Sequence, residues 1–104
     1  MNDPLAALLV ETEGFEWDAA NEPKLLARHD VTRAEVEQLF FHVPILLAID
    51  LKHSASEPRY LALGRTVDNR LLHLVFTIRG RHIRPISARN MNRKERTRYA
   101  QAQA

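Results

Sequence analysis

The residues best suited to chemistry are basic side chains gathered in the second half of the chain. Residues 59–104 contain eleven Arg or Lys against two acids, a net formal charge of +9, whereas residues 1–58 contain four against eleven, a net of −7. Clustered guanidinium and ammonium groups bind phosphates and release the counterions that surround a nucleic acid. The pattern therefore predicts a surface for a polyanion. The candidate phosphate-contacting residues are Arg28, Arg79, Arg81, Arg84, Arg93, Lys94 and Arg96.

Three other side chains could move protons or contact a substrate, and each has an ordinary structural alternative. His29 titrates near neutrality and suits general acid–base chemistry, but at a helix end it can equally favour the helix dipole. Glu95 lies three residues after Asn92, a spacing that favours helix capping over a catalytic carboxylate. Tyr99 can pack as a core aromatic, or it can hydrogen-bond a phosphate or stack on a base.

The composition argues against metal, thiol and membrane chemistry. The chain has no cysteine, and its other four histidines lack the spacing of metal ligands, so we expect neither a metal site nor a cofactor. No apolar run approaches the roughly 20 residues of a membrane span, and residues 5–10 do not resemble a signal peptide. We therefore expect a cytoplasmic protein without membrane contact. The four scattered histidines are His42, His53, His73 and His82.

Capping signals predict the helices that must position these residues. Thr32 and Glu35 have capping-box spacing ahead of an apolar stripe, which predicts a helix through residue 41. Asn21 is predicted to cap a helix with Pro in its first turn, and Asn92 with Glu95 starts a terminal helix. The predicted helices span residues 3–11, 21–29, 31–41 and 92–101.

Alternating and apolar runs predict an antiparallel meander of about four strands. In residues 72–79 the apolar side chains share one face, which is typical of a half-buried strand. Residues 68–69 and Gly80 suit tight turns, and Pro85 should restrict the last strand to a sheet edge. A length of 104 residues suits one domain, 1–104, with residues 1–12 as an N-terminal extension. The predicted strands span residues 45–51, 59–66, 72–79 and 82–88, with a further short strand at 12–17.

Five motifs together resemble the BrnT family of type II toxins. They are FEWD at 15–18, RHDV at 28–31, TRAEVEQLF at 32–40, RYLALG at 59–64 and the closing RPISARNMNRKERTRY. The resemblance implies an α+β fold similar to RelE-type ribonucleases, with helices packed on an antiparallel sheet. It also implies that the chain cuts RNA and arrests growth.

The resemblance further implies site residues and a partner. The implied partner is a BrnA-like ribbon-helix-helix antitoxin that embraces the toxin and represses their operon, so that DNA is contacted only through the antitoxin. If cleavage proceeds without metal, arginines must stabilise the pentacoordinate phosphate while another group moves protons. Our hypothesis from the sequence is that Arg59 and Arg89 clamp the phosphate and His29 transfers the proton. The implied functional residues are His29, Arg59, Arg89, Glu95 and Tyr99.

Two other functions compete with an RNA-cleaving enzyme. A non-catalytic module could use the same basic surface to bind RNA or an acidic antitoxin segment. A DNA-binding module could use the helix pair at 21–41, which has helix-turn-helix connectivity. The second helix presents Glu35 and Glu37 where a recognition helix needs basic or amide side chains, so duplex reading is the weakest alternative.

Overall fold

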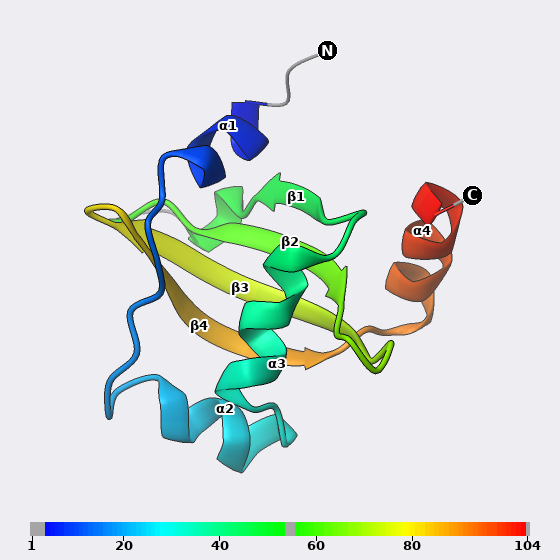
Figure 1. Ribbon diagram of the computed structural model, residues 1–104, viewed down its shortest axis with the longest axis horizontal. Coiled ribbons are helices and arrows are strands. Elements are labelled where there is room, and N and C mark those ends of the chain that lie inside the picture. The colour runs from blue at the N-terminus through cyan, green and yellow to red at the C-terminus, as the bar shows by residue number, and fades with distance from the viewer. Residues whose placement is uncertain (1–3, 54–55, 104) are drawn as a thin grey trace.

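A four-stranded antiparallel sheet forms the centre of the protein. The computed structural model describes residues 4–53 and 56–103. The strands β1 (Leu46–Ile49), β2 (Tyr60–Arg65), β3 (Leu71–Arg79) and β4 (His82–Asn90) lie side by side in chain order (Figure 1). Every neighbouring pair is antiparallel, so the predicted α+β meander is confirmed.

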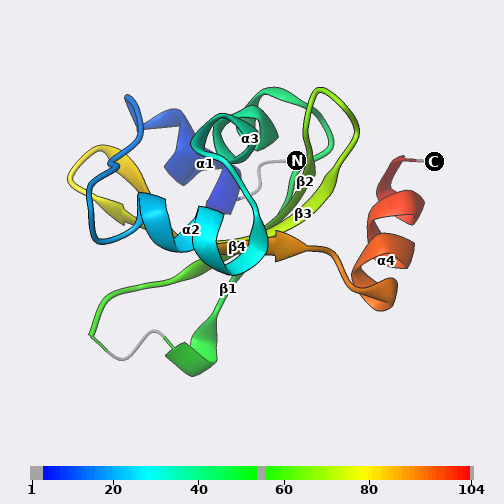
Figure 2. The ribbon, with the colours of Figure 1, turned by 90° about the horizontal axis from the view of Figure 1, so that it is seen from below.

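Helices cover one face of this sheet and one end. The first three, α1 (Pro4–Val10), α2 (Glu22–His29) and α3 (Arg33–Gln38), lie on the same side of the strands (Figure 2). The last, α4 (Arg93–Gln103), stands beyond the ends of the strands and leaves the rest of the second face open. The predicted helix start at residue 3 lies outside the described residues. Two short 3-10 helices, η1 (Leu39–Phe41) and η2 (Leu51–His53), flank β1.

The capping box predicted for α3 is confirmed. The Thr32 hydroxyl accepts a hydrogen bond from the Glu35 amide at 3.1 Å, while the Glu35 carboxylate accepts one from the Thr32 amide at 2.9 Å. Both bonds satisfy amides that a helix start leaves unpaired. The α-helix ends earlier than predicted, because its last turn tightens into η1.

The covered face holds the main core. Leu72, Leu74 and Phe76 of β3 pack there with Leu39 of η1, all buried. These three β3 residues are the apolar set that alternation assigned to one face, so that prediction is confirmed. The tight turns also form as predicted, with positive φ at Asn69 and Gly80. The second face is therefore the one that remains available to a ligand.

The register of the strands aligns side chains of all four strands in rows across this second, open face. Leu46 pairs with Leu63, Leu63 with His73, and His73 with Arg89, so one rung crosses all four strands. The next rung on the same face, two residues along each strand, is Ala48, Leu61, Val75 and Ser87. Each rung is apolar on β1 and β2 and becomes polar or basic toward β4.

The prediction of a strand at 12–17 is wrong, although the segment does lie against the sheet. It makes one isolated bridge, Phe15 to Ile83, and exchanges backbone hydrogen bonds with β4 through Gly14 and Glu16 at 2.8–2.9 Å. A register shift opposite Pro85 interrupts the β3–β4 ladder, consistent with the predicted edge position. The segment covers part of this edge, which is therefore not an open docking surface.

The predicted capping role of Asn21 is also wrong. Its side chain makes no capping bond to α2 and is instead buried, with an exposed fraction of 3%. The amide nitrogen donates to the carbonyls of Glu16 and Pro85 at 3.0 Å each, and the amide oxygen accepts from the Asp18 backbone at 2.8 Å. Asn21 therefore fixes the N-terminal segment to the irregular part of β4.

We predict that Asn21→Ala lowers the free energy of unfolding by about 2 kcal/mol, because buried carbonyl and amide groups lose their partners. Chemical denaturation monitored by circular dichroism would measure this change. Gln101→Ala, at an exposed position of α4, should stay within about 0.5 kcal/mol of the wild type. Equal stability of the two variants would contradict the structural role of Asn21.

Candidate functional site

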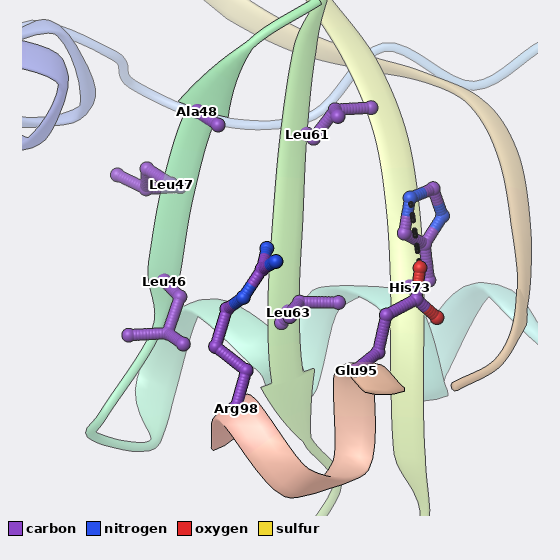
Figure 3. Close-up of a pocket in the computed structure, with 8 residues that line it drawn as sticks. All are labelled: Leu46, Leu47, Ala48, Leu61, Leu63, His73, Glu95 and Arg98. Atoms are coloured by element: carbon purple, nitrogen blue, oxygen red, sulfur yellow. Dashed lines mark ion pairs between the residues drawn. The ribbon is translucent and has the colours of Figure 1, made fainter. Parts of the chain in front are cut away.

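Glu95 joins β4 to α4 at the polar end of the open face. Its carboxylate receives two hydrogen bonds from the Arg89 guanidinium, at 2.8 and 3.0 Å, in a bidentate ion pair. The Nε2 atom of His73 lies 3.8 Å from the same carboxylate (Figure 3). The structure thus brings the predicted residues Arg89 and Glu95 together and adds His73, one of the four histidines for which the sequence indicates no role.

The predicted capping role of Glu95 is confirmed alongside this ion pair. Its carboxylate accepts a hydrogen bond from the Asn92 amide at 2.8 Å, and its own amide donates to the Asn92 side chain at 2.9 Å. The helix start thus fixes the carboxylate. A position three residues into the helix lets one side chain cap α4 and bind the neighbouring strand at the same time.

The charges around this cluster shift the pKa values of its members. Hydrogen bonding from Arg89 lowers the pKa of Glu95 to about 2, helped by the Asn92 amide and by the charge of Arg89, against an opposing effect of burial. Burial lowers the pKa of His73, and the charge of Arg89 lowers it further, against an opposing influence of Glu95. At neutral pH the cluster therefore holds an ionised carboxylate beside a neutral imidazole, a form able to accept a proton.

A cavity of about 160 Å³ opens beside His73 and Glu95. Arg98 of α4 extends over β2 into this space, on the same face of the sheet as His73 (Figure 3). Within the described part of the chain, Arg98 makes no hydrogen bond or ion pair, so its guanidinium is available to a ligand. Arg98 was absent from our predicted site because helical spacing alone does not show which basic residue of α4 faces the sheet.

Two residues of the sequence-based site hypothesis lie elsewhere on the molecule. His29 is exposed at the end of α2, in the helical layer, where its carbonyl accepts a hydrogen bond from Arg70. Arg59 precedes β2, four residues from Leu63 of the His73 rung, which corresponds to about 13 Å along a strand. The structure therefore does not bring His29 and Arg59 together with Arg89.

Tyr99 fills a core position. Its side chain is fully buried, packs with Leu63 and Met91, and donates a hydrogen bond to the Pro44 carbonyl at 2.6 Å. Burial raises the pKa of its hydroxyl. Of the two roles weighed from the sequence, packing is the one that this position fits, because the ring anchors α4 to the sheet and its hydroxyl is already bonded.

Several predicted phosphate-contacting arginines are neutralised within the protein. Arg84 bonds the carboxylates of Glu16 and Asp18, both at 2.9 Å, and only 9% of the residue is exposed. Arg79 pairs with Glu57 at 3.0 Å, which lowers the pKa of that carboxyl. Arg81 lies near the N-terminal segment as well, 3.7 Å from Glu13. Acids from the first half of the chain thus offset the basic β3–β4 hairpin.

The remaining predicted phosphate-contacting residues lie on two helices, α2 and α4. Arg28 is exposed on α2, over the covered face of the sheet. Arg93 and Lys94 are exposed in the first turn of α4, while Arg96 donates to the Met91 carbonyl at 2.8 Å.

The described residues contain no group of three or more His, Cys, Asp or Glu placed to hold a metal ion. Across the same residues, no helix is long and apolar enough to cross a membrane.

These observations define a small α+β domain with a largely apolar cavity on the open face of its sheet, to which His73, Glu95 and Arg98 add polar groups. The chain belongs to the BrnT family of ribonuclease toxins of type II toxin-antitoxin systems, whose family model matches residues 17–95. No curated protein matches the chain in a sequence comparison. The family match confirms the resemblance seen in the motifs, and it ends before Arg98 and Tyr99.

We predict that Glu95→Gln lowers the free energy of unfolding by about 2 kcal/mol at pH 7. The folded-state pKa of about 2 is below the ordinary 4.5, so ionised Glu95 stabilises the fold above pH 4.5. This contribution is lost as the pH falls toward 2, and the difference from wild type should shrink over that window. Denaturant unfolding between pH 2 and 7 measures it, with exposed Glu11→Gln as the control for losing one carboxylate. A pH-independent difference would contradict the assignment.

Proposed function

We propose that this chain is an endoribonuclease toxin that cuts RNA without a metal ion, using His73, Arg89, Glu95 and Arg98. One observation carries the proposal: an imidazole with a lowered pKa and an unpaired guanidinium line one cavity. Membership of a ribonuclease toxin family supports the choice of RNA as the substrate.

In the proposed reaction, His73 Nε2 takes the proton from a ribose 2′-hydroxyl. The 2′-oxygen then attacks the adjacent phosphorus, the bond to the 5′-oxygen breaks, and the departing oxygen takes a proton from water. The products are a 2′,3′-cyclic phosphate and a 5′-hydroxyl end. The Glu95 carboxylate, 3.8 Å from Nε2, stabilises the imidazolium that forms when His73 accepts the proton.

Arg98 and Arg89 supply positive charge to the pentacoordinate phosphate. Arg98 is free of protein partners in the described chain and can bind two phosphate oxygens in a fork. Arg89 already binds Glu95 through its two terminal nitrogens, so it contributes charge from a fixed position. Donors fixed in advance stabilise developing charge without reorganising during the reaction.

The family also supports a protein partner. We propose that a cognate antitoxin of the BrnA-like ribbon-helix-helix kind neutralises the toxin, and that DNA is contacted only through that antitoxin. The toxin would act in the cytoplasm, where its RNA substrate is translated. An antitoxin that presents acidic side chains to Arg98 and the exposed basic residues of α4 would compete with RNA for the cavity.

A non-catalytic binding module is the alternative, and one observation favours it. The side chains of His73 and Glu95 are only 14% and 15% exposed, so a substrate has little direct access to either group. A module of this kind would bind RNA or an acidic antitoxin segment and leave the RNA intact.

We predict that His73→Ala lowers the rate of RNA cleavage about 100-fold or more, because the proton acceptor is lost. Arg98→Ala should lower it by a similar factor through weaker stabilisation of the phosphate. Cleavage of purified RNA in the presence of EDTA, with growth after induced expression, measures both effects. Both variants should also abolish growth arrest.

His29→Ala and Arg33→Ala are matched controls on the opposite face, and both should cleave at the wild-type rate. Loss of cleavage in His29→Ala would restore the original hypothesis for proton transfer. RNA binding without cleavage by the wild type would support the binding module instead.

We predict a pH–rate profile with an acidic limb set by His73. Its lowered pKa places the loss of the neutral imidazole below 6.5, so kcat/KM should be level at neutral pH and fall at more acidic pH. Cleavage rates from pH 4.5 to 8 in the presence of EDTA measure the profile. An acidic limb that remains in His73→Ala would show that another group accepts the proton.

A further inference from the structure

The open face of β1 and β2 is unusually apolar for a sheet surface without a covering layer. An antiparallel sheet normally turns polar residues toward solvent on its uncovered face. Here four aliphatic side chains of two neighbouring strands lie on this face and line the cavity, although Leu63 is mostly covered by Met91 and Tyr99. We call them the aliphatic shelf. Its members are Leu46, Ala48, Leu61 and Leu63.

The shelf is continuous with the polar part of the same cavity. Leu63 pairs directly with His73 in the sheet, and the Arg98 side chain extends from α4 over β2, where its guanidinium lies above the shelf (Figure 3). The cavity is therefore lined by aliphatic side chains on β1 and β2, by His73 and Glu95 where α4 meets β3, and by the Arg98 guanidinium over β2. A ligand that fills it must combine an apolar body with an anionic group.

We propose that the aliphatic shelf binds one nucleobase of the RNA, next to the phosphate held between Arg98 and His73. This inference rests on the proposed function and names the substrate contact that positions the scissile strand. A nucleotide joins a flat, largely apolar base to a phosphate within one unit, which matches the two ends of the cavity. A protein segment would need an acidic side chain beside an apolar one to achieve the same match.

The shelf also determines what can be recognised. Its four side chains carry no hydrogen-bond donor or acceptor, so they contact the face of a base and cannot read its edge. Contacts to base faces are tolerant of sequence because every base has one. The shelf should therefore bind the four bases with similar affinity while still requiring that a base be present.

A binding experiment on the intact protein tests the shelf without depending on cleavage. Methyl NMR titrations would compare adenosine 5′-monophosphate with ribose 5-phosphate, which has the same sugar and phosphate but no base. We predict that the nucleotide binds about tenfold more tightly and shifts the methyl signals of Leu61 and Leu63. Leu61→Gln should remove most of this preference. Ile49→Gln, on β1 but facing away from the shelf, should retain it.

Several results would overturn the shelf proposal. Equal affinity for the two ligands, no binding of either at millimolar concentration, or an undiminished preference in Leu61→Gln would each do so. If Leu61→Gln does not fold, the exposed Ala48→Gln variant provides the same test. Methyl shifts caused by the cognate antitoxin but not by the nucleotide would make the shelf a protein contact. If the protein cleaves RNA but binds the nucleotide no more tightly than ribose 5-phosphate, only the shelf proposal is overturned. If it prefers the nucleotide but does not cleave RNA, only the proposed reaction is overturned.

Discussion

The ionised carboxylate of Glu95 is the interaction on which the site depends. It caps α4, binds the guanidinium of Arg89 on β4 and faces the imidazole of His73 on β3. These contacts fix where α4 leaves the sheet, and with Tyr99 packed beneath, they determine where Arg98 extends. A pKa of about 2 keeps the charge in place across the physiological range. The carboxylate therefore acts as a positioning group for both the proposed proton acceptor and the proposed phosphate ligand.

The acidic first part of the chain and the basic second part form ion pairs with each other in the folded protein. Acids of the N-terminal segment pair with the arginines of the β3–β4 hairpin, most closely at Arg84, which bonds both Glu16 and Asp18. Glu35 similarly binds Arg70 at 3.0 Å and joins α3 to the sheet. Among the described residues, Arg98 on α4 lines the cavity without an acidic partner. Neutralisation of the β3–β4 hairpin therefore leaves this guanidinium as the positive charge at the cavity.

The two faces of the sheet have different roles: one holds the apolar core, and the other carries the proposed functional site. The covered face holds a continuous apolar core, whereas the open face runs from aliphatic side chains on β1 to charged ones on β4. This gradient gives one shallow cavity two different ends. Within a small domain, such an arrangement lets the same rung of paired residues support α4, present an imidazole and offer an apolar surface to a substrate.

Much of the fold follows from local patterns in the sequence. Capping residues such as Thr32 and Glu35, turn residues such as Asn69, and strict alternation in β3 each act over a few residues, so they predict elements correctly. The short strand predicted at 12–17 does not form, because the segment makes only one isolated bridge to β4. Asn21 does not cap α2, because its side chain bonds a distant carbonyl of β4 instead.

The candidate site was only partly predictable. Arg89 and Glu95 lie six residues apart around one strand end, and the family resemblance of the closing motif implied both as site residues. His73 and Arg98 join them only through the register of β3 against β4 and the packing of α4 on the sheet. The sequence thus determined the elements, the family and the excess of positive charge near the C-terminus. The tertiary structure decided which cations are neutralised and which face a cavity, because ion pairing and register depend on residues distant in the chain.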